Sequence, residues 1–146
     1  GLTILLAVRK STRKTAAALA VALGLCLLCG NLLLKPLIGR IRPFNVQDAI
    51  TLLIAAPLDY SFPSGHTMSS FAAAMVLLLT DRRMGIPAML LAGLIAFSRM
   101  YLYVHYPTDV LAGLLMGCLF GWLAVRIVQK LHARRFQRNQ QEKPHS

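Results

Sequence analysis

Four basic residues, two histidines and one aspartate stand at the borders of apolar segments in this sequence. They are Lys35, Arg40, Arg42, Arg99, His66, His105 and Asp109. Charges at or just below a membrane surface are costly, so we take a functional role as the first hypothesis for them. Arginine matches phosphate oxygens with paired N–H donors and lysine adds a point charge, whereas the nearby acids Asp48, Asp59 and Asp109 are too few to pair every cation. This excess of positive charge predicts an anionic ligand, and phosphate is the simplest one.

The segment from Pro63 to His66 is typical of a helix start that receives an anion. Proline and serine favour the first positions of a helix, and Gly65 lets the backbone approach a ligand closely. The unpaired N–H groups and the positive end of the helix dipole then face the anion. Pro107 opens a later helix in the same way, shortly after His105. We therefore expect two helix N-termini to converge on one pocket.

His105 and Asp109 are four residues apart, which is about one helical turn. If the residues between them turn helically, the Asp109 carboxylate reaches one ring nitrogen of His105 and leaves the other nitrogen free for nucleophilic attack. His66 is the second candidate for proton transfer, as the acid that protonates a leaving oxygen. Singly, His66 could be a helix cap, Arg99 an interface anchor and Asp109 a favourable charge at a helix N-terminus. Their joint arrangement favours the catalytic interpretation.

Apolar segments predict the helices that position these side chains. With 56% hydrophobic and 14% charged residues, the chain is too apolar for an ordinary soluble domain. A spanning helix needs about 20 apolar residues, and the candidate spans are residues 15–34, 64–80, 85–104 and 108–128. Residues 36–63 contain four prolines and predict a loop, whose apolar stretch from Ile50 to Ala56 we place in the membrane interface.

The N-terminal segment is apolar, whereas the C-terminal segment is polar and basic. The residues up to Val8 look like the end of an earlier apolar helix, and the sequence begins with Gly1 rather than methionine, so we expect an N-terminal truncation. We divide the chain into a membrane-embedded domain, residues 1–128, and a basic, partly disordered cytoplasmic tail, residues 129–146. The three cysteines all lie in apolar runs, which indicates packing rather than a disulfide framework or a metal site.

The basic residues divide between the two sides of the predicted membrane. Because four spans alternate in direction, 12 of the 16 basic residues fall on one side, which the positive-inside rule identifies as cytoplasmic. They are Arg9, Lys10, Arg13, Lys14, Arg82, Arg83, Arg126, Lys130, Arg134, Arg135, Arg138 and Lys143. The other four cations share the opposite side with both candidate histidines, against the rule. We therefore expect the site on the extracytoplasmic face of the plasma or inner membrane, and we attribute the net charge of +11 to membrane orientation rather than to nucleic-acid binding.

Three motifs, in the right order, resemble those of the type 2 phosphatidic acid phosphatase and vanadium haloperoxidase superfamily. The first runs from Lys35 to Pro43 as KPLIGRIRP, the second is the PSGH segment that ends at His66, and the third runs from Ser98 to Asp109 as SRMYLYVHYPTD. The spacing within each motif fits without a gap. Residues 35–109, about half of the chain, carry the resemblance.

The resemblance implies an all-α, multi-pass transmembrane helical bundle with an acid phosphatase/vanadium haloperoxidase-like core. In such a site His105 attacks phosphorus and forms a phosphohistidine, Asp109 orients His105, and His66 protonates the leaving group and then activates water. The phosphate oxygens are bound by Lys35, Arg42, Ser64, Gly65 and Arg99. The resemblance implies no metal and no other cofactor. Arg40 is not a motif residue, and we expect it to contact a lipid headgroup or nothing.

The implied activity is hydrolysis of a lipid phosphate or diphosphate at headgroup depth, with membrane lipids as the other partners and no nucleic acid. Undecaprenyl diphosphate, phosphatidic acid and phosphatidylglycerol phosphate are candidate substrates, and analogy slightly favours the isoprenyl carrier. Two alternatives stay open. One is a vanadate-dependent haloperoxidase, against which the membrane spans argue. The other is a non-catalytic phospholipid-binding or transport protein, against which the complete set of His66, His105 and Asp109 argues. Membrane members usually have six spans, whereas this chain supplies about four.

Overall fold

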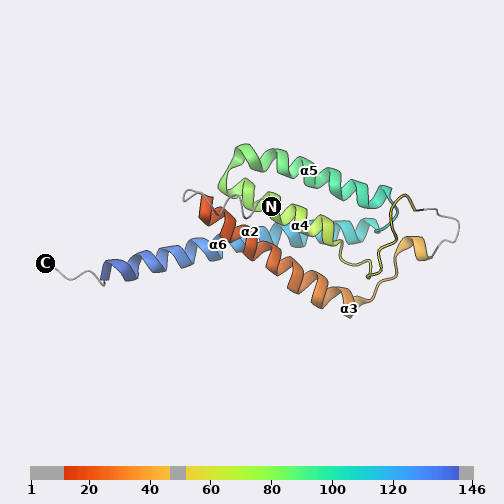
Figure 1. The fold of residues 1–146 in the computed structure, drawn as a ribbon, viewed down its shortest axis with the longest axis horizontal. Helices are drawn as coiled ribbons and strands as arrows, with labels where there is room; N and C mark the ends of the chain where they lie inside the picture. Colours follow the sequence, from red (N-terminus) through yellow and green to blue (C-terminus); the bar gives the residue numbers. More distant parts are fainter. Residues whose placement is uncertain (1–11, 47–51, 142–146) are drawn as a thin grey trace.

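The computed structural model describes residues 12–46 and 52–141, which form an all-α bundle without strands (Figure 1). A long first helix consists of α2 (Arg13–Leu25), the π-helix η2 (Cys26–Leu34) and α3 (Lys35–Ile38), and the 3₁₀ turn η3 (Pro43–Asn45) follows. An irregular loop then leads to α4 (Gly65–Thr80), α5 (Arg82–Tyr101) and α6 (Pro107–Gln141). The all-α prediction is confirmed. The predicted helix remnant before Val8, the acid Asp48 and the first part of the apolar stretch from Ile50 to Ala56 lie outside the described residues.

Three of the described helical segments are long and apolar enough to cross a membrane. They are Arg13–Asn45, Arg82–Tyr101 and Pro107–Arg135. The remaining predicted span, α4, is apolar but has 16 residues, about 24 Å at the usual helical rise. This is less than the ~30 Å of the hydrocarbon core. We therefore expect one end of α4 to lie below a membrane surface.

The first span continues past the point where the sequence predicts a loop. The loop is expected from Pro36, but the chain stays helical to Ile38. Pro36 is tolerated because it stands in the first turn of a new α-helical segment, where its missing N–H removes little. The helix stops at Gly39, whose φ of 60° lies in the left-handed region that glycine adopts without strain. Lys35 and Arg42 therefore stand on either side of a tight change of direction.

The end of α5 also differs from the prediction. The third span is expected to reach Val104, but α5 ends at Tyr101. The following residues are irregular, and Tyr103 has a left-handed φ of 58°. Because the backbone is no longer helical here, the Val104 carbonyl is free to accept a hydrogen bond from Arg42. The same irregular segment sets His105 directly before α6.

The prediction of a partly disordered tail is wrong for residues 129–141, since α6 remains helical as far as Gln141. This stretch contains no glycine or proline and many good helix formers. It also extends a helix that already exists, so it needs no nucleation of its own. The result is a helix that projects well beyond the bundle (Figure 1).

The centre of the bundle is α4, which packs against α2, α5 and α6. Its close approach to α6 depends on a stripe of glycines at four-residue spacing, Gly113, Gly117 and Gly121. A Cβ atom at Gly117 would lie 2.3 Å from the carbonyl oxygen of Met68 in α4. This confirms the close helix packing that the stripe predicts. Asp109 continues the stripe and is fully buried.

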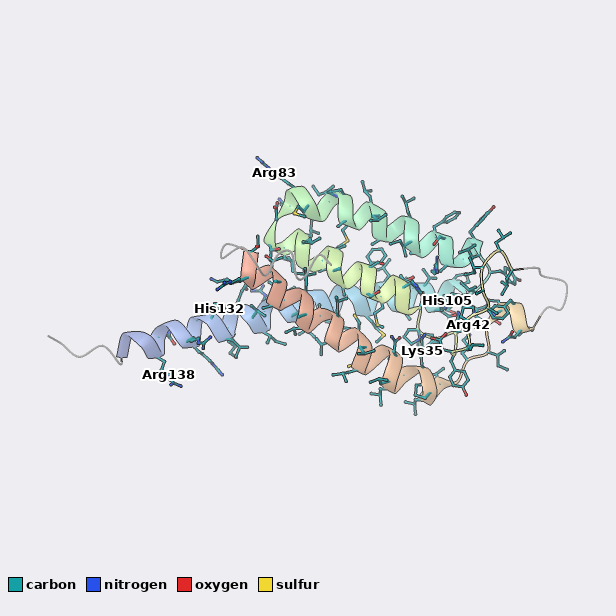
Figure 2. All side chains as sticks on the ribbon, viewed as in Figure 1. Lys35, Arg42, Arg83, His105, His132 and Arg138 are labelled. Carbon is teal, nitrogen blue, oxygen red and sulfur yellow. The ribbon has the colours of Figure 1, made fainter. Side chains whose placement is uncertain are left out.

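Charged side chains lie at the two ends of the bundle (Figure 2). Lys35, Arg42 and His105 are close together at one end, whereas Arg83 and Arg138 lie toward the other. The helices between them expose mainly large apolar residues, among them Leu90, Leu94 and Leu115. The candidate site therefore lies at one end of an apolar bundle, on the side opposite the basic C-terminal helix.

Candidate active site

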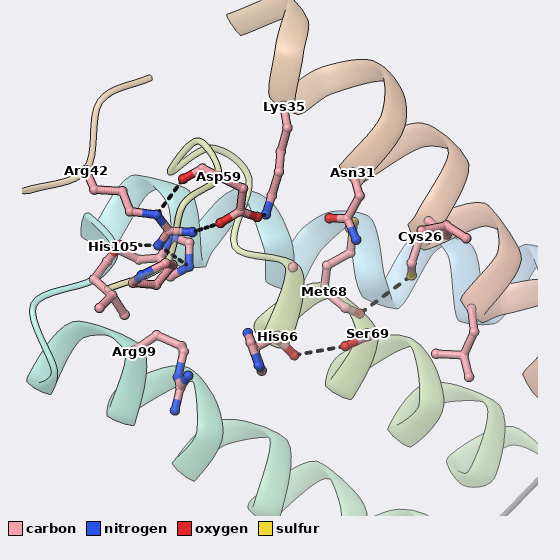
Figure 3. A pocket seen from close by; sticks show the side chains of 15 residues that line it. Cys26, Asn31, Lys35, Arg42, Asp59, His66, Met68, Ser69, Arg99 and His105 are labelled. Carbon is pink, nitrogen blue, oxygen red and sulfur yellow. Dashed lines mark hydrogen bonds and ion pairs between the residues drawn. The ribbon is translucent and has the colours of Figure 1, made fainter. Parts of the chain in front are cut away.

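One cavity of about 320 Å³ contains most of the residues that the sequence singled out (Figure 3). The predicted residues in its lining are Lys35, Arg42, Gly65, His66, Arg99 and His105. They come from α3, the loop after it, the first turn of α4, the end of α5 and the segment before α6. Leu23, Leu27 and Met68 line another part of the cavity. The cavity thus has a cationic part and an apolar part, which suits an amphiphilic ligand.

The two predicted helix N-termini converge. The backbone N–H of Ser64, just before α4, donates to the carbonyl oxygen of Asp109 in the first turn of α6 at 3.1 Å. Ser64 itself is fully buried, and its hydroxyl lies 2.9 Å from Oγ1 of Thr67. The cavity is therefore lined by Gly65 and not by Ser64. A Cβ atom at Gly65 would lie 3.1 Å from Oδ1 of Asn31, so a larger residue there would crowd the cavity wall.

His105 and Asp109 are brought together, with Ser61 beside both. Nδ1 of His105 lies 3.7 Å from Oδ2 of Asp109, which is an ion-pair distance and too long for a hydrogen bond. The Ser61 hydroxyl donates to the same Oδ2 at 2.5 Å and lies 3.5 Å from Nδ1. The Tyr106 N–H also donates to Oδ2, at 2.9 Å. The predicted orienting carboxylate therefore lies beside the imidazole and is linked to it through the serine.

The other carboxylate oxygen of Asp109 is bound by Arg40. Nη1 of Arg40 lies 2.6 Å from Oδ1 of Asp109 and 2.7 Å from Oγ1 of Thr108. The guanidinium also stacks over the Tyr106 ring, 4.0 Å from the centroid, in a cation–π contact. The expectation that Arg40 contacts a lipid headgroup or nothing is wrong, because a buried carboxylate needs a compensating charge and Arg40 supplies it.

Arg42 is held deep in the site, with 4% of its surface exposed. Its Nε donates to the backbone carbonyl of Asp59 and its Nη1 to that of Val104, both at 2.7 Å. Nη1 also lies 3.3 Å from Nε2 of His105. Since a guanidinium can only donate, Nε2 of a neutral His105 accepts and Nδ1 carries the proton. In this tautomer the lone pair of Nε2 is on the cation side of the ring.

An acid occupies the space between the two predicted phosphate ligands. Oδ2 of Asp59 pairs with Nζ of Lys35, and Oδ1 lies 2.5 Å from Nη2 of Arg42. Partial burial raises the pKa of Asp59, but the hydrogen bonds from Lys35 and Arg42 outweigh it and hold this pKa below its usual range. Asp59 is therefore an anion at neutral pH.

His66 and Arg99 face the same cavity from α4 and α5 (Figure 3). Arg99 Nε donates to its neighbour Ser98 at 3.2 Å, and among the described residues no carboxylate pairs with Arg99. The backbone carbonyl of His66 accepts a hydrogen bond from Ser69, and His66 belongs to the cavity lining. Both side chains are thus available to a ligand.

Sequence reasoning missed Ser61 and Asp59 as site residues and misjudged Arg40. Ser61 and Asp59 lie in the loop before the PSGH segment, where spacing alone does not show which side chains turn inward. A polar triplet of Asp59, Tyr60 and Ser61 directly before a buried helix start was the available signal. Arg40 had a stronger signal, since a buried carboxylate at Asp109 requires a partner charge.

Comparison with known proteins decides the family. Residues 15–133 match the model of the PAP2 superfamily. The chain belongs to this superfamily. It is 38% identical over 126 residues to the undecaprenyl-diphosphatase of Sulfolobus acidocaldarius, covering 86% of this chain and 61% of that protein. It is 37% identical over 111 residues to the lipid A 4′-phosphatase of Bacteroides thetaiotaomicron, covering 71% of this chain and 49% of that protein. The chain thus spans about half to three fifths of the length of these relatives.

Two solved structures have the same fold. The crystal structure of Aquifex aeolicus LpxE matches with a TM-score of 0.75 and 31% identity, over 86% of this chain and 74% of that one. The transmembrane PAP2-type phosphatidylglycerolphosphate phosphatase of Bacillus subtilis matches with a TM-score of 0.70 and 28% identity, over 88% of this chain and 68% of that one. The predicted superfamily and the multi-pass membrane bundle are confirmed.

Proposed function

We propose that this PAP2 protein is a membrane phosphatase that hydrolyses a lipid phosphate or diphosphate through a phosphohistidine intermediate. The observation that carries the proposal is the shared cavity of Lys35, Arg42, Arg99, His66 and His105 at one end of an apolar bundle. Cations that converge with so few acids suit a phosphoryl group, and the two imidazoles supply a nucleophile and an acid. One relative is named an undecaprenyl-diphosphatase and another a lipid A 4′-phosphatase, which supports the same class of reaction here.

The proposed reaction has two steps. Nε2 of His105 attacks phosphorus and forms a P–N bond, while the P–O bond to the lipid breaks and the leaving oxygen takes a proton from His66. Asp109 stabilises the positive charge that develops on the His105 ring, and Ser61 and Arg40 hold Asp109. In the second step His66 removes a proton from water, whose oxygen attacks phosphorus and breaks the P–N bond. Lys35, Arg42 and Arg99 stabilise the charge on the transferring group in both steps, with Gly65 as the remaining proposed phosphate ligand. Ser64, which the motif resemblance also implied, is buried outside the cavity lining and is not part of the proposal.

The substrate and the location follow from the position of the site. Its end of the bundle is opposite the basic α6 extension, which the positive-inside rule assigns to the cytoplasm. We therefore place the site on the extracytoplasmic face of the plasma or inner membrane. An isoprenyl diphosphate carrier is our preferred substrate, with phosphatidic acid and phosphatidylglycerol phosphate as alternatives. The phosphate lies in the cationic part of the cavity and the first methylene or isoprene units lie toward Leu23 and Leu27.

The test is phosphate release from a panel of these three lipids by the chain in detergent, with EDTA present. Wild type is compared with His105→Ala, His66→Ala and Arg99→Ala. His132→Ala is the matched control, because His132 lies toward the opposite end and contacts the Val128 carbonyl of its own helix. We expect release by wild type and the control, and almost none by the three site variants. Undiminished phosphate release by His105→Ala would refute the assignment of His105 as the nucleophile. Loss of phosphate release in EDTA would refute a reaction without a metal. Lipid binding without turnover would favour a transport protein, and vanadate-dependent halide oxidation would favour a haloperoxidase.

A further inference from the structure

The carboxylate of Asp59 lies where the proposed phosphate ligands converge (Figure 3). Its two oxygens are bound by Lys35 and by Nη2 of Arg42, and Asp59 lines the same cavity as His105. A carboxylate and a phosphate group accept hydrogen bonds from the same donors with similar geometry. The donors of Lys35 and Arg42 that bind Asp59 are therefore not available to a phosphoryl group at the same time.

The third cation of the cavity is not engaged by this carboxylate. Arg99 bonds to Ser98 only through Nε and pairs with no carboxylate in the part of the chain that the structure describes. Asp59 thus neutralises one positive charge and leaves the cavity cationic. An incoming phosphate group can contact Arg99 first and then replace the Asp59 carboxylate at Lys35 and Arg42.

The geometry also allows the carboxylate to leave without disturbing the site. The Asp59 side chain is 54% exposed, whereas the Arg42 side chain is 4% exposed. Arg42 is anchored by two backbone carbonyls, those of Asp59 and Val104. These anchors do not involve the carboxylate. Rotation of the Asp59 side chain would therefore free both cations while Arg42 stays in place.

We propose that Asp59 is an internal competitor for the phosphate site, which weakens the binding of substrate and of product phosphate by the same factor. The proposal rests on the proposed function for its meaning in catalysis. A site built to stabilise a transferring phosphoryl group also binds the phosphate that it releases. Binding that is equally strong for ground state and transition state does not raise kcat. A carboxylate that returns to Lys35 and Arg42 would help to expel the product.

The experiment compares wild type, Asp59→Asn and Asp59→Glu as full chains in detergent. Asp81→Asn is the control, because it removes a carboxylate that binds the Arg83 N–H between α4 and α5, away from the cavity. The Kd of inorganic phosphate is measured by calorimetry, which needs no turnover. KM, kcat and product inhibition by phosphate are measured with phosphatidic acid.

For Asp59→Asn we expect the Kd of phosphate, its Ki and KM all to fall by about tenfold, the change expected for the loss of one doubly bonded competing anion. We expect kcat to be unchanged or lower, and Asp59→Glu and Asp81→Asn to resemble wild type. A rise of Kd and KM in Asp59→Asn would overturn the inference, since it would mean that the carboxylate organises Lys35 and Arg42 for phosphate. If Asp59→Asn binds phosphate more tightly but neither it nor wild type releases phosphate from lipid, Asp59 is a competitor for the anion site and the proposed phosphatase activity is refuted.

Discussion

Nη1 of Arg42 lies 3.3 Å from Nε2 of His105, so one proposed phosphate ligand directly contacts the proposed nucleophile. Because the guanidinium only donates hydrogen bonds, the contact selects the His105 tautomer with its proton on Nδ1, beside Ser61 and Asp109. Nε2 has a single lone pair, so it attacks phosphorus only when the bound phosphoryl group has displaced this hydrogen bond from Arg42. Binding and attack are therefore coupled through one side chain.

Ser61 should act as a positioning residue for this imidazole. In Ser61→Ala, Asp109 keeps Arg40 and the Tyr106 N–H but loses a short hydrogen bond. We expect kcat to fall about tenfold, in line with one hydrogen bond to a charged group (~1.5 kcal/mol), with little change in KM. Steady-state kinetics in detergent measures both values. Ser61→Thr keeps the hydroxyl and should recover most of the activity. An equal loss in both variants would show that the hydroxyl is not the relevant group.

Arg40 should contribute to stability as well as to activity. Its removal leaves the fully buried Asp109 carboxylate without its charged partner. For Arg40→Ala we expect a loss of about 2 kcal/mol in unfolding free energy, typical of a buried charge that loses a charged hydrogen-bond donor. Thermal unfolding in detergent measures the change. Arg126→Ala, which removes an arginine stacked on Trp122 in α6, is the control and should alter Tm much less. Equal Tm values for the two variants would contradict the role of Arg40.

The packing of α4 on α6 predicts a clear contrast between two glycines. In Gly117→Ala the new Cβ would lie 2.3 Å from the Met68 carbonyl oxygen, whereas at Gly93 in α5 no atom lies within 4 Å. We expect Gly117→Ala to lower Tm and Gly93→Ala to raise it slightly, because alanine favours the helix. Since α6 carries Asp109, the first variant should also lose activity. Similar Tm values for both would contradict the close approach of these helices.

The pairing of Asp59 predicts a pH-dependent stability. Hydrogen bonds from Lys35 and Arg42, acting against burial, hold the pKa of Asp59 below its usual range in the folded protein. The stability from this pair is therefore complete above the ordinary aspartate pKa of about 3.9 and is lost as the pH falls further. The Tm difference between wild type and Asp59→Asn should be constant from neutral pH to about pH 5 and shrink below it. A difference that grows on acidification would contradict this sign.

The sequence predicts the helices and the motif residues because both depend on local patterns. Apolar length gives the spans, and the resemblance of three motifs to those of the superfamily predicts Lys35, Arg42, His66, Arg99 and His105 as site residues. The sequence does not predict the contacts that depend on the course of the loops. The Arg40–Asp109 pair joins residues far apart in the chain, across two turns whose course depends on Gly39 and Tyr103.

The errors in helix length have similar causes. Pro36 suggests a break, but the real stop is at Gly39, where the backbone becomes left-handed. The polar composition after Val128 suggests disorder, but an apolar helix already formed upstream continues through it to Gln141. In both cases the neighbouring segment, and not the local composition, determines the structure.

The most direct test of the proposed mechanism is to trap the phosphorylated enzyme. A phosphate ester with a good leaving group, such as p-nitrophenyl phosphate, needs little help from an acid in the first step. The His66→Ala variant should then be phosphorylated but hydrolyse slowly. After quenching in alkaline denaturant, which preserves phosphohistidine, mass spectrometry of the peptides locates the phosphoryl group. The account predicts that it is on His105 and is absent when His105→Ala is added. A phosphoryl group on any other residue, or none on either variant while phosphate is still released, would contradict it.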